Sequence, residues 1–140
     1  MTILSFDING NAYSFYRCKY APVESNMYIL ILDNEAIVID AMPSKEMKEF
    51  LDANGVKTIY LFLTHEHYDH SNGVCWWKEN FNTILLCHKY CSEKLSTYDR
   101  SNPRLVAFKL FELDKIDGGN RYDEFKRNFV PYNVRADIAF

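Results

Sequence analysis

The sequence predicts an α/β fold whose central sheet is mixed, with both parallel and antiparallel strand pairs. Three short apolar runs, at residues 36–39, 58–64 and 83–87, have the length and continuity of strands buried on both faces. In the segments between them, apolar residues recur every three or four positions, which is typical of helices with one buried side. Strands that alternate with helices form β-α-β units, in which neighbouring strands run parallel.

An antiparallel hairpin is expected ahead of the first of these units. Residues 13–20 and 26–32 are rich in aromatic and branched side chains, which favours strands. The short connection between them, which contains Pro22, fits a turn between antiparallel strands. The strand at residues 36–39 should follow directly, after a turn at Asn34-Glu35.

The first helix has clear signals at both ends. Ser44 can cap its beginning, and Asn54-Gly55 is a typical helix end. Between them, three apolar residues share one side of the helix: Met47, Phe50 and Leu51. A second short helix is expected after Asn72-Gly73, just before the strand at residues 83–87.

The pattern weakens after residue 92. Helical turns are expected on both sides of a break at Asn102-Pro103, and residues 117–120 form a plain turn signal. A short helix is then predicted by three spaced aromatic residues: Tyr122, Phe125 and Phe129. Residues 134–140 alternate between apolar and polar side chains and predict a final strand with one dry face.

Composition limits the classes of protein and of partner. The 140 residues, 48% hydrophobic and 25% charged, are ordinary for one globular domain. A net charge of -3 without a basic run argues against nucleic acid as a partner. The longest apolar stretch, residues 27–32, is far shorter than the roughly twenty residues of a membrane helix, and residues 1–10 lack a signal-peptide pattern. We therefore expect no membrane association and a cytoplasmic location.

The segment His65-Glu66-His67-Tyr68-Asp69-His70 holds three of the four histidines of the chain. It follows a buried strand, and the carboxyl ends of parallel strands are the usual place for ligand sites in α/β sheets. His65 and His67 are two residues apart, so in an extended backbone their imidazoles point the same way and can chelate one cation. The turn that follows can direct Asp69 and His70 to an adjacent position. The spacing therefore predicts two neighbouring metal sites, with zinc as the expected ion and iron or manganese as alternatives.

The four cysteines and the fourth histidine, His88, are not expected to form a second metal site. The four cysteines contain no Cys-x-x-Cys pair and are expected to be free thiols. Cys87, His88 and Cys91 lack a fourth ligand at a suitable spacing. Glu66 and Tyr68 are expected to be spacers that point away from the ions.

The His-x-His-x-Asp-His pattern, preceded by Asn26-Met27-Tyr28-Ile29-Leu30 and Ile37-Val38-Ile39-Asp40-Ala41, resembles the metallo-β-lactamase superfamily, which includes glyoxalase II-like hydrolases. The resemblance implies half of an αββα sandwich, a mixed sheet with helices on one face. It also implies that His65 and His67 bind the first metal and that Asp69 and His70 bind the second. In that family, metal-activated hydroxide attacks an acyl or phosphoryl centre. Asp69 would be the catalytic residue that orients the hydroxide, and Asp40 would support the site without touching the metal.

The family completes its site with a later histidine loop, a bridging aspartate and a last histidine, none of which the sequence contains. The resemblance thus implies a single domain, residues 1–140, truncated before the third-histidine loop, and Asp137 should not be taken for the bridging ligand. Each metal would lack a protein ligand, which argues against activity of the isolated chain. Two function classes follow: a metallo-hydrolase acting on a small-molecule substrate of unknown identity, or a non-catalytic half-domain with a vestigial metal loop.

A half-domain would leave an apolar sheet face uncovered. Two copies of the chain could pack these faces together as a homodimer that rebuilds the sandwich. In the alternative arrangement, a monomer covers the face with a rearranged carboxyl-terminal segment.

Overall fold

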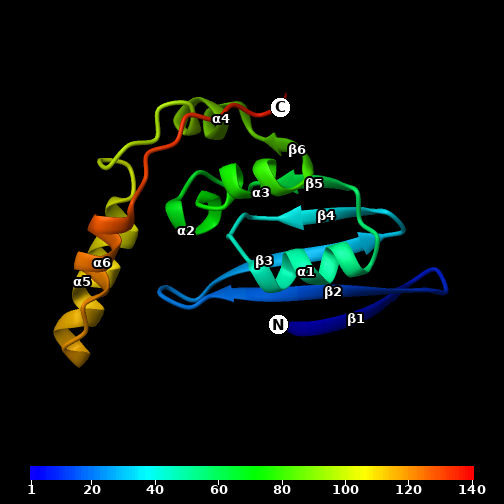
Figure 1. The fold of residues 1–140 in the computed structure, drawn as a ribbon, viewed down its shortest axis with the longest axis horizontal. Coiled ribbons are helices and arrows are strands. Elements are labelled where there is room, and N and C mark those ends of the chain that lie inside the picture. Colours follow the sequence, from blue (N-terminus) through cyan, green and yellow to red (C-terminus); the bar gives the residue numbers. More distant parts are fainter.

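The computed structural model describes residues 1–140, which form one seven-stranded mixed sheet and six helices (Figure 1). The sheet order follows the chain: β1 (Thr2–Ile8), β2 (Asn11–Tyr20), β3 (Ser25–Leu32), β4 (Glu35–Ile39), β5 (Thr58–Phe62), β6 (Asn82–Cys87) and β7 (Ile138–Ala139). Strands β1 to β4 pair antiparallel, and β4 to β7 pair parallel. The helices are α1 (Lys45–Ala53), α2 (Tyr68–Ser71), α3 (Val74–Asn80), α4 (Lys89–Leu95), α5 (Arg104–Asp117) and α6 (Arg121–Asn128). No helix has the length and apolar character needed to cross a membrane.

The elements predicted with the clearest signals are present. Strands β2 and β3 form the antiparallel hairpin, and β4 and β5 are parallel neighbours on either side of α1. Helix α1 begins after Ser44, whose Oγ accepts a hydrogen bond from the Met47 amide at 3.2 Å. The helices at residues 74–80, 104–117 and 121–128 also confirm the predictions from apolar spacing.

Two expectations about the sheet need correction. Strand β1, to which the sequence analysis assigned no element, extends the sheet beyond the hairpin; most of its side chains are exposed, so no buried face marks it. The strand predicted at residues 134–140 is wrong for its first part. The amide of Val134 donates to Leu95 O, and that of Ala136 donates to Ser92 Oγ, so this segment packs on α4. Only Ile138–Ala139 pairs with β6.

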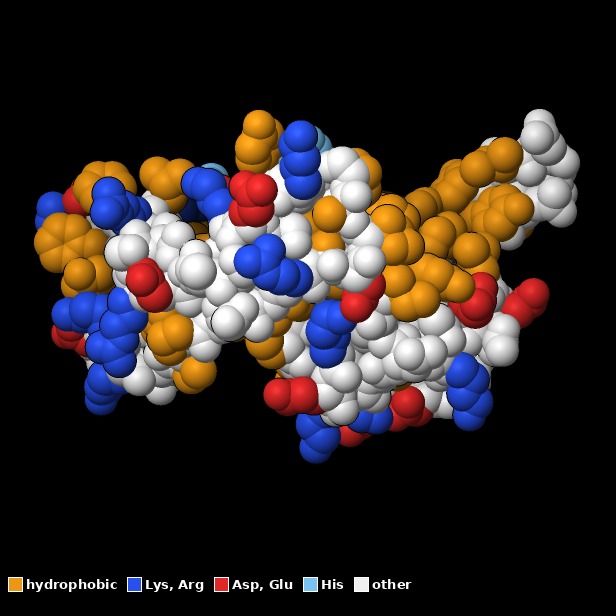
Figure 2. All heavy atoms as spheres, turned by 90° about the horizontal axis from the view of Figure 1, so that it is seen from above, with side chains coloured by type: hydrophobic (Ala, Val, Ile, Leu, Met, Phe, Trp, Pro, Cys, Tyr) orange, Lys and Arg blue, Asp and Glu red, His pale blue; other side chains and the backbone are white.

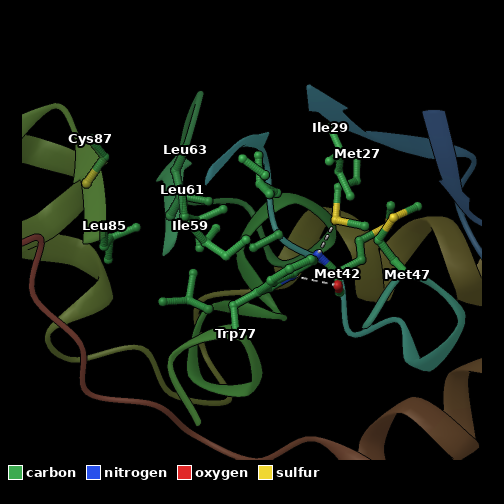
Figure 3. Close-up of a cluster of buried hydrophobic side chains, with 14 of the residues drawn as sticks. Met27, Ile29, Met42, Met47, Ile59, Leu61, Leu63, Trp77, Leu85 and Cys87 are labelled. Carbon is green, nitrogen blue, oxygen red and sulfur yellow. Dashed lines mark hydrogen bonds between the residues drawn. The ribbon is translucent and has the colours of Figure 1, made fainter. Parts of the chain in front are cut away.

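Helices α1 and α3 cover one face of the sheet, and the main core lies between them and the strands (Figures 1 and 3). Trp77 of α3 is fully buried there, and its indole N–H donates to the Met42 carbonyl at 2.9 Å. The strands contribute alternate residues to this core, among them Met27, Ile29, Ile59, Leu61 and Leu85. The residues between them necessarily point to the opposite face.

That opposite face carries no helix and is apolar across six strands. One row of directly paired residues crosses it from β1 to β6: Leu4, Phe15, Leu30, Ile37, Tyr60 and Ile84. We call this row the open sheet face. Leu4 is exposed, and the other five members are half-buried. Figure 2 shows hydrophobic side chains gathered on the right side of the molecule, toward the projecting end of the β1–β2 hairpin.

Helices α5 and α6 form a helical hairpin beside the sheet, at the end where α2 lies (Figure 1). Val106 and Leu110 of α5 pack on Val23 in the turn between β2 and β3. On α6, the ring of Phe125 meets that of Tyr68 at a centroid distance of 5.1 Å. The hairpin is thus attached to the body of the protein next to the His65–His70 segment.

Asp137 holds the last segment of the chain to the sheet. Its Oδ2 accepts hydrogen bonds from the Leu85 amide at 2.7 Å and from Lys78 Nζ at 2.6 Å. Burial by itself raises the pKa of Asp137, but these hydrogen bonds and the charge of Lys78 outweigh burial and hold the pKa below its usual value. The ionised carboxylate therefore stabilises the fold.

We expect Asp137→Ala to lower the free energy of unfolding by about 1 kcal/mol at pH 7, a modest value because water reaches this ion pair. A carboxyl whose pKa is lower in the folded state contributes stability above its unfolded pKa, about 4, and loses it as the pH falls through the folded value. The difference in unfolding free energy between the two proteins should therefore shrink as the pH falls below about 4. A difference that stays constant with pH would contradict this account.

Candidate metal centre

The His65–His70 segment lies at the carboxyl end of β5, as its place in the sequence predicts. Strand β5 ends at Phe62, and α2 begins at Tyr68, so His65 and His67 lie in the connection and Asp69 and His70 lie in α2. The Ser71 hydroxyl donates to the carbonyls of Glu66 and His67 at 2.9 and 3.0 Å, which ties this connection into a compact turn. A short loop between two fixed elements is thereby held at the sheet edge.

All four predicted ligands come together. The imidazole centroids of His65 and His67 are 4.5 Å apart, and those of His65 and His70 are 4.2 Å apart. Asp69 Oδ2 lies 3.4 Å from His70 Nε2. Three imidazoles and one carboxylate therefore share one site.

Asp40 lies at the end of β4 and is almost fully buried. Its Oδ2 is 2.7 Å from His70 Nδ1, and its Oδ1 accepts from the amide and the hydroxyl of Thr64, each at 2.8 Å. The backbone of Asp40 is left-handed, with φ at 62°, and its amide donates to Phe62 O at 2.8 Å. The carboxylate thus contacts the imidazole ring of His70 at the nitrogen opposite to the one near Asp69.

The two intervening residues of the motif have other partners. Glu66 Oε1 is 3.4 Å from Lys94 Nζ on α4. The Tyr68 ring contacts the rings of Phe125 and Phe129. Neither side chain is directed among the clustered imidazoles.

The electrostatic environment lowers the pKa of His65. Burial lowers the pKa of His65, and the charges that His70 and His67 carry when protonated lower it further, against the opposite effect of Asp40 and Asp69. A metal ion needs the lone pair of a neutral imidazole. The environment of His65 therefore suits a ligand better than a proton carrier.

The donor set fits a transition metal, although the side chains do not form a closed coordination sphere. Imidazole nitrogen and carboxylate oxygen are the ligands that zinc, iron and manganese accept. No group of three or more His, Cys, Asp or Glu side chains is arranged to hold an ion directly. The chemistry of the donors, and not a preformed geometry, is the property that fits a metal.

The other histidine and the last aspartate lie outside the cluster. His88 caps α4, and its Nδ1 accepts from the Tyr90 amide at 3.2 Å. Asp137 binds Leu85 and Lys78, as described above. All four cysteines are free, and Cys87 and Cys91 are buried.

Sequence reasoning missed two residues that shape the site. Thr64 lies between Asp40 and His65, with its Oγ1 2.9 Å from His65 Nδ1; its place directly before the motif is a signal that was available. Tyr132 OH lies 2.6 Å from Ser71 Oγ behind the turn. No signal could have identified Tyr132, because 61 residues separate it from Ser71.

A pocket of about 140 Å³ opens beside the motif. It contains one predicted ligand, His67, and two cationic side chains, Lys94 and Arg104. The rest of the lining is Glu66, Tyr68, Tyr98, Asn102, Pro103, Leu105 and Val106. The pocket can accept a small group that carries negative charge.

Known proteins resemble this chain in sequence. The model of the metallo-β-lactamase superfamily matches residues 20–123. A hydroxyacylglutathione hydrolase from Rippkaea orientalis is 31% identical over 126 residues, which cover 87% of this chain and 46% of the relative. Hydroxyacylglutathione hydrolase 1 from Vibrio vulnificus is 41% identical over 64 residues, which cover 46% of this chain and 26% of the relative. The chain spans less than half the length of either relative.

A solved structure supports the fold. The BLEG-1 B3 metallo-β-lactamase superposes with a TM-score of 0.59 at 20% identity, covering 90% of this chain and 52% of that one. This likeness confirms the predicted fold class, a mixed sheet with helices that corresponds to part of a metallo-β-lactamase structure. Because the family model matches residues 20–123, most of the chain, the chain belongs to the metallo-β-lactamase superfamily and is similar within it to hydroxyacylglutathione hydrolases.

Proposed function

We propose that this protein is a metal-dependent hydrolase that binds one or two zinc ions at the His65–His70 cluster, with iron or manganese as alternative ions. The observation that carries the proposal is the gathering of three imidazoles and a carboxylate at the carboxyl edge of the parallel strands. Such a cluster has no evident folding benefit, because groups that protonate near pH 6.5 repel one another when charged.

The four residues divide into two ligand pairs, and one of the four, Asp69, has a second role as the group that orients water. His65 and His67 would hold the first ion, and Asp69 and His70 would hold the second. When bound, the metal supplies a Lewis acid that makes water nucleophilic near neutral pH and stabilises negative charge on the substrate. The Asp69 carboxylate, whose Oδ2 lies 3.4 Å from His70 Nε2, would also accept a hydrogen bond from the attacking water and orient it.

Acyl thioesters of glutathione are the substrate class that we propose first. The relatives named above are hydroxyacylglutathione hydrolases, which supports an acyl centre over a phosphoryl centre. Glutathione carries negative carboxylates, and the pocket beside His67 offers Lys94 and Arg104. Lys94 is shared with Glu66, so Arg104 is the side chain of the pocket best able to hold such an anionic substrate by charge-assisted hydrogen bonds.

We further propose that groups outside residues 1–140 complete the site. A catalytic zinc ion usually has three protein ligands and one open position, and two pairs of ligands supply only two for each ion. The greater length of the curated relatives supports this proposal. The alternative is a half-domain that binds metal and does not catalyse hydrolysis.

The test combines metal analysis with an assay of hydrolysis. The purified chain is loaded with zinc, dialysed, analysed for metal and assayed with an acyl-glutathione thioester, a phosphodiester and a β-lactam. His88→Ala is the matched control for His65→Ala. Retained zinc with thioester hydrolysis that His65→Ala abolishes supports the hydrolase. Retained zinc without hydrolysis of any of the three substrates means that residues 1–140 do not catalyse by themselves, as expected both for the half-domain and for a site that outside groups complete. Failure to retain zinc overturns both.

We also propose that residues 1–140 self-associate through the open sheet face. This apolar row crosses six strands and lacks a covering helix, and soluble monomers seldom expose a large apolar patch. Packing the face on its copy around a two-fold axis buries it in an isologous interface.

Light scattering at micromolar concentration should give twice the 16.5 kDa mass of the chain. Ile37→Lys places a charge in the middle of the face and should shift the mass toward that of the monomer. The control is Ile116→Lys, at an exposed position on α5. A monomer that resists dilution and binds no hydrophobic dye would exclude the dimer and favour a carboxyl-terminal segment rearranged over the face.

A further inference from the structure

We infer that Thr64 is a positioning residue, whose hydroxyl links Asp40 to His65 and thereby decides which nitrogen of His65 is free to bind metal. The metal-binding purpose of this role rests on the proposed function, whereas the hydrogen-bond chain itself does not. The chain runs from Asp40 Oδ1 to Thr64 Oγ1 over 2.8 Å and from Thr64 Oγ1 to His65 Nδ1 over 2.9 Å.

The direction of each hydrogen bond follows from the number of available protons. An ionised carboxylate can only accept, so the single hydroxyl proton of Thr64 is donated to Asp40. The Thr64 oxygen can then only accept from the imidazole. His65 Nδ1 must therefore carry a proton, which leaves the lone pair of a neutral His65 on Nε2.

Asp40 imposes the same tautomer on His70 without an intermediary. Its Oδ2 lies 2.7 Å from His70 Nδ1, so this nitrogen donates and the lone pair of His70 lies on Nε2, on the side of Asp69. One buried carboxylate thus sets two imidazoles that we assign to different metal positions. It acts on His70 directly and on His65 only through Thr64.

The backbone holds Thr64 in the required place. Its amide donates to Asp40 Oδ1 at 2.8 Å, and the amide of Asp40 donates back to Phe62 O at 2.8 Å. Threonine is branched at Cβ and so has few accessible χ1 rotamers, which keeps the hydroxyl directed between its two partners. Removal of the hydroxyl should therefore free the His65 ring while the backbone contact persists.

Asp40 acts on His70 directly but on His65 only through Thr64, and this difference separates a positioning role of Thr64 from a general structural one. Thr64→Val keeps the shape and the amide but removes the hydroxyl, so only His65 should lose its fixed tautomer. Thr64→Ser keeps a hydroxyl and should restore it. Asp40→Asn should disturb both His65 and His70.

The tautomers are measured by long-range proton–nitrogen correlation NMR on the metal-free chain, at a pH above which the imidazole nitrogen signals no longer change. His88 is an internal reference, because its Nδ1 accepts from the Tyr90 amide and must be unprotonated. In the wild-type chain we expect Nδ1–H for His65 and His70 and Nε2–H for His88. In Thr64→Val we expect a mixture for His65 alone. Nε2–H at His65 in the wild-type chain would overturn the inference even if no variant folds.

Zinc titration provides the second readout. Loss of a partner that orients a metal-binding imidazole typically costs about 10-fold to 100-fold in affinity, and we expect a loss in this range for Thr64→Val and near-wild-type affinity for Thr64→Ser. Equal affinity of Thr64→Val and the wild type would refute the positioning role. If the tautomers behave as expected and the wild-type chain binds no zinc, the proposed function fails and the hydrogen-bond chain stands.

Discussion

Replacement of both His65 and His67 with alanine is expected to remove nearly all zinc that the chain retains under mild chelation, a fall of about tenfold or more. The two imidazoles are the proposed ligands of the first ion and lie 4.5 Å apart. Without them, the second position keeps only Asp69 and His70, and two ligands bind a transition metal weakly. Metal content after dialysis, measured by mass spectrometry, reports the effect.

The matched control is His88→Ala. This histidine caps α4, away from the cluster, so its loss removes an imidazole without touching the proposed ligands. Its metal content should equal that of the wild type. Unchanged zinc in the double variant would show that the ion binds elsewhere on the chain.

Gly73→Ala is expected to destabilise the fold by about 3 kcal/mol, the upper end of the range for overpacking. Gly73 lies between α2 and α3, where the backbone passes very close to Met42. A Cβ atom on Gly73 would lie 2.5 Å from the Met42 carbonyl carbon and 2.8 Å from its Cα. Backbone atoms cannot move aside as a side chain can, so α3 would have to shift away from the strand end. Urea unfolding measures the loss.

Gly119→Ala is the informative comparison for this clash. A Cβ there also approaches other atoms, the nearest at 2.6 Å, but these belong to the ends of the Arg121, Asp114 and Asp117 side chains. Such side chains can rotate, so we expect a loss below about 1 kcal/mol. Similar losses for both variants would mean that the contact with the Met42 backbone is not the cause.

The sequence predicted the central part of the fold because burial there is periodic. Strands β4 and β5 are short apolar runs, and α1 has one buried side with a serine cap, so pattern and structure agree. Strand β1 lacks such a pattern because most of its side chains are exposed. The alternation at residues 134–136 is real, but it reflects packing against α4, since the amides of Val134 and Ala136 donate to Leu95 and Ser92 and not to a strand.

The predicted ligands were easier to identify from the sequence than Asp40 and Thr64, the residues that hydrogen-bond to them. Four ligand-type residues within six positions form a local signal, and the structure brings their side chains together. Asp40 was found through the family resemblance. The hydrogen bonds through Thr64 depend on the left-handed backbone of Asp40 and on the distance between two strand ends, which no local pattern encodes.

Tyr68 connects the helical hairpin to the His65–His70 segment. Its ring is held by Phe125 and Phe129, while its backbone lies between His67 and Asp69. A change in the position of Phe125 on α6 would therefore be transmitted through the Tyr68 ring to the backbone between two proposed ligands. Substitutions on α6 can thus change the exchange rate of a bound ion, although this helix lies more than fifty residues after His70 along the chain.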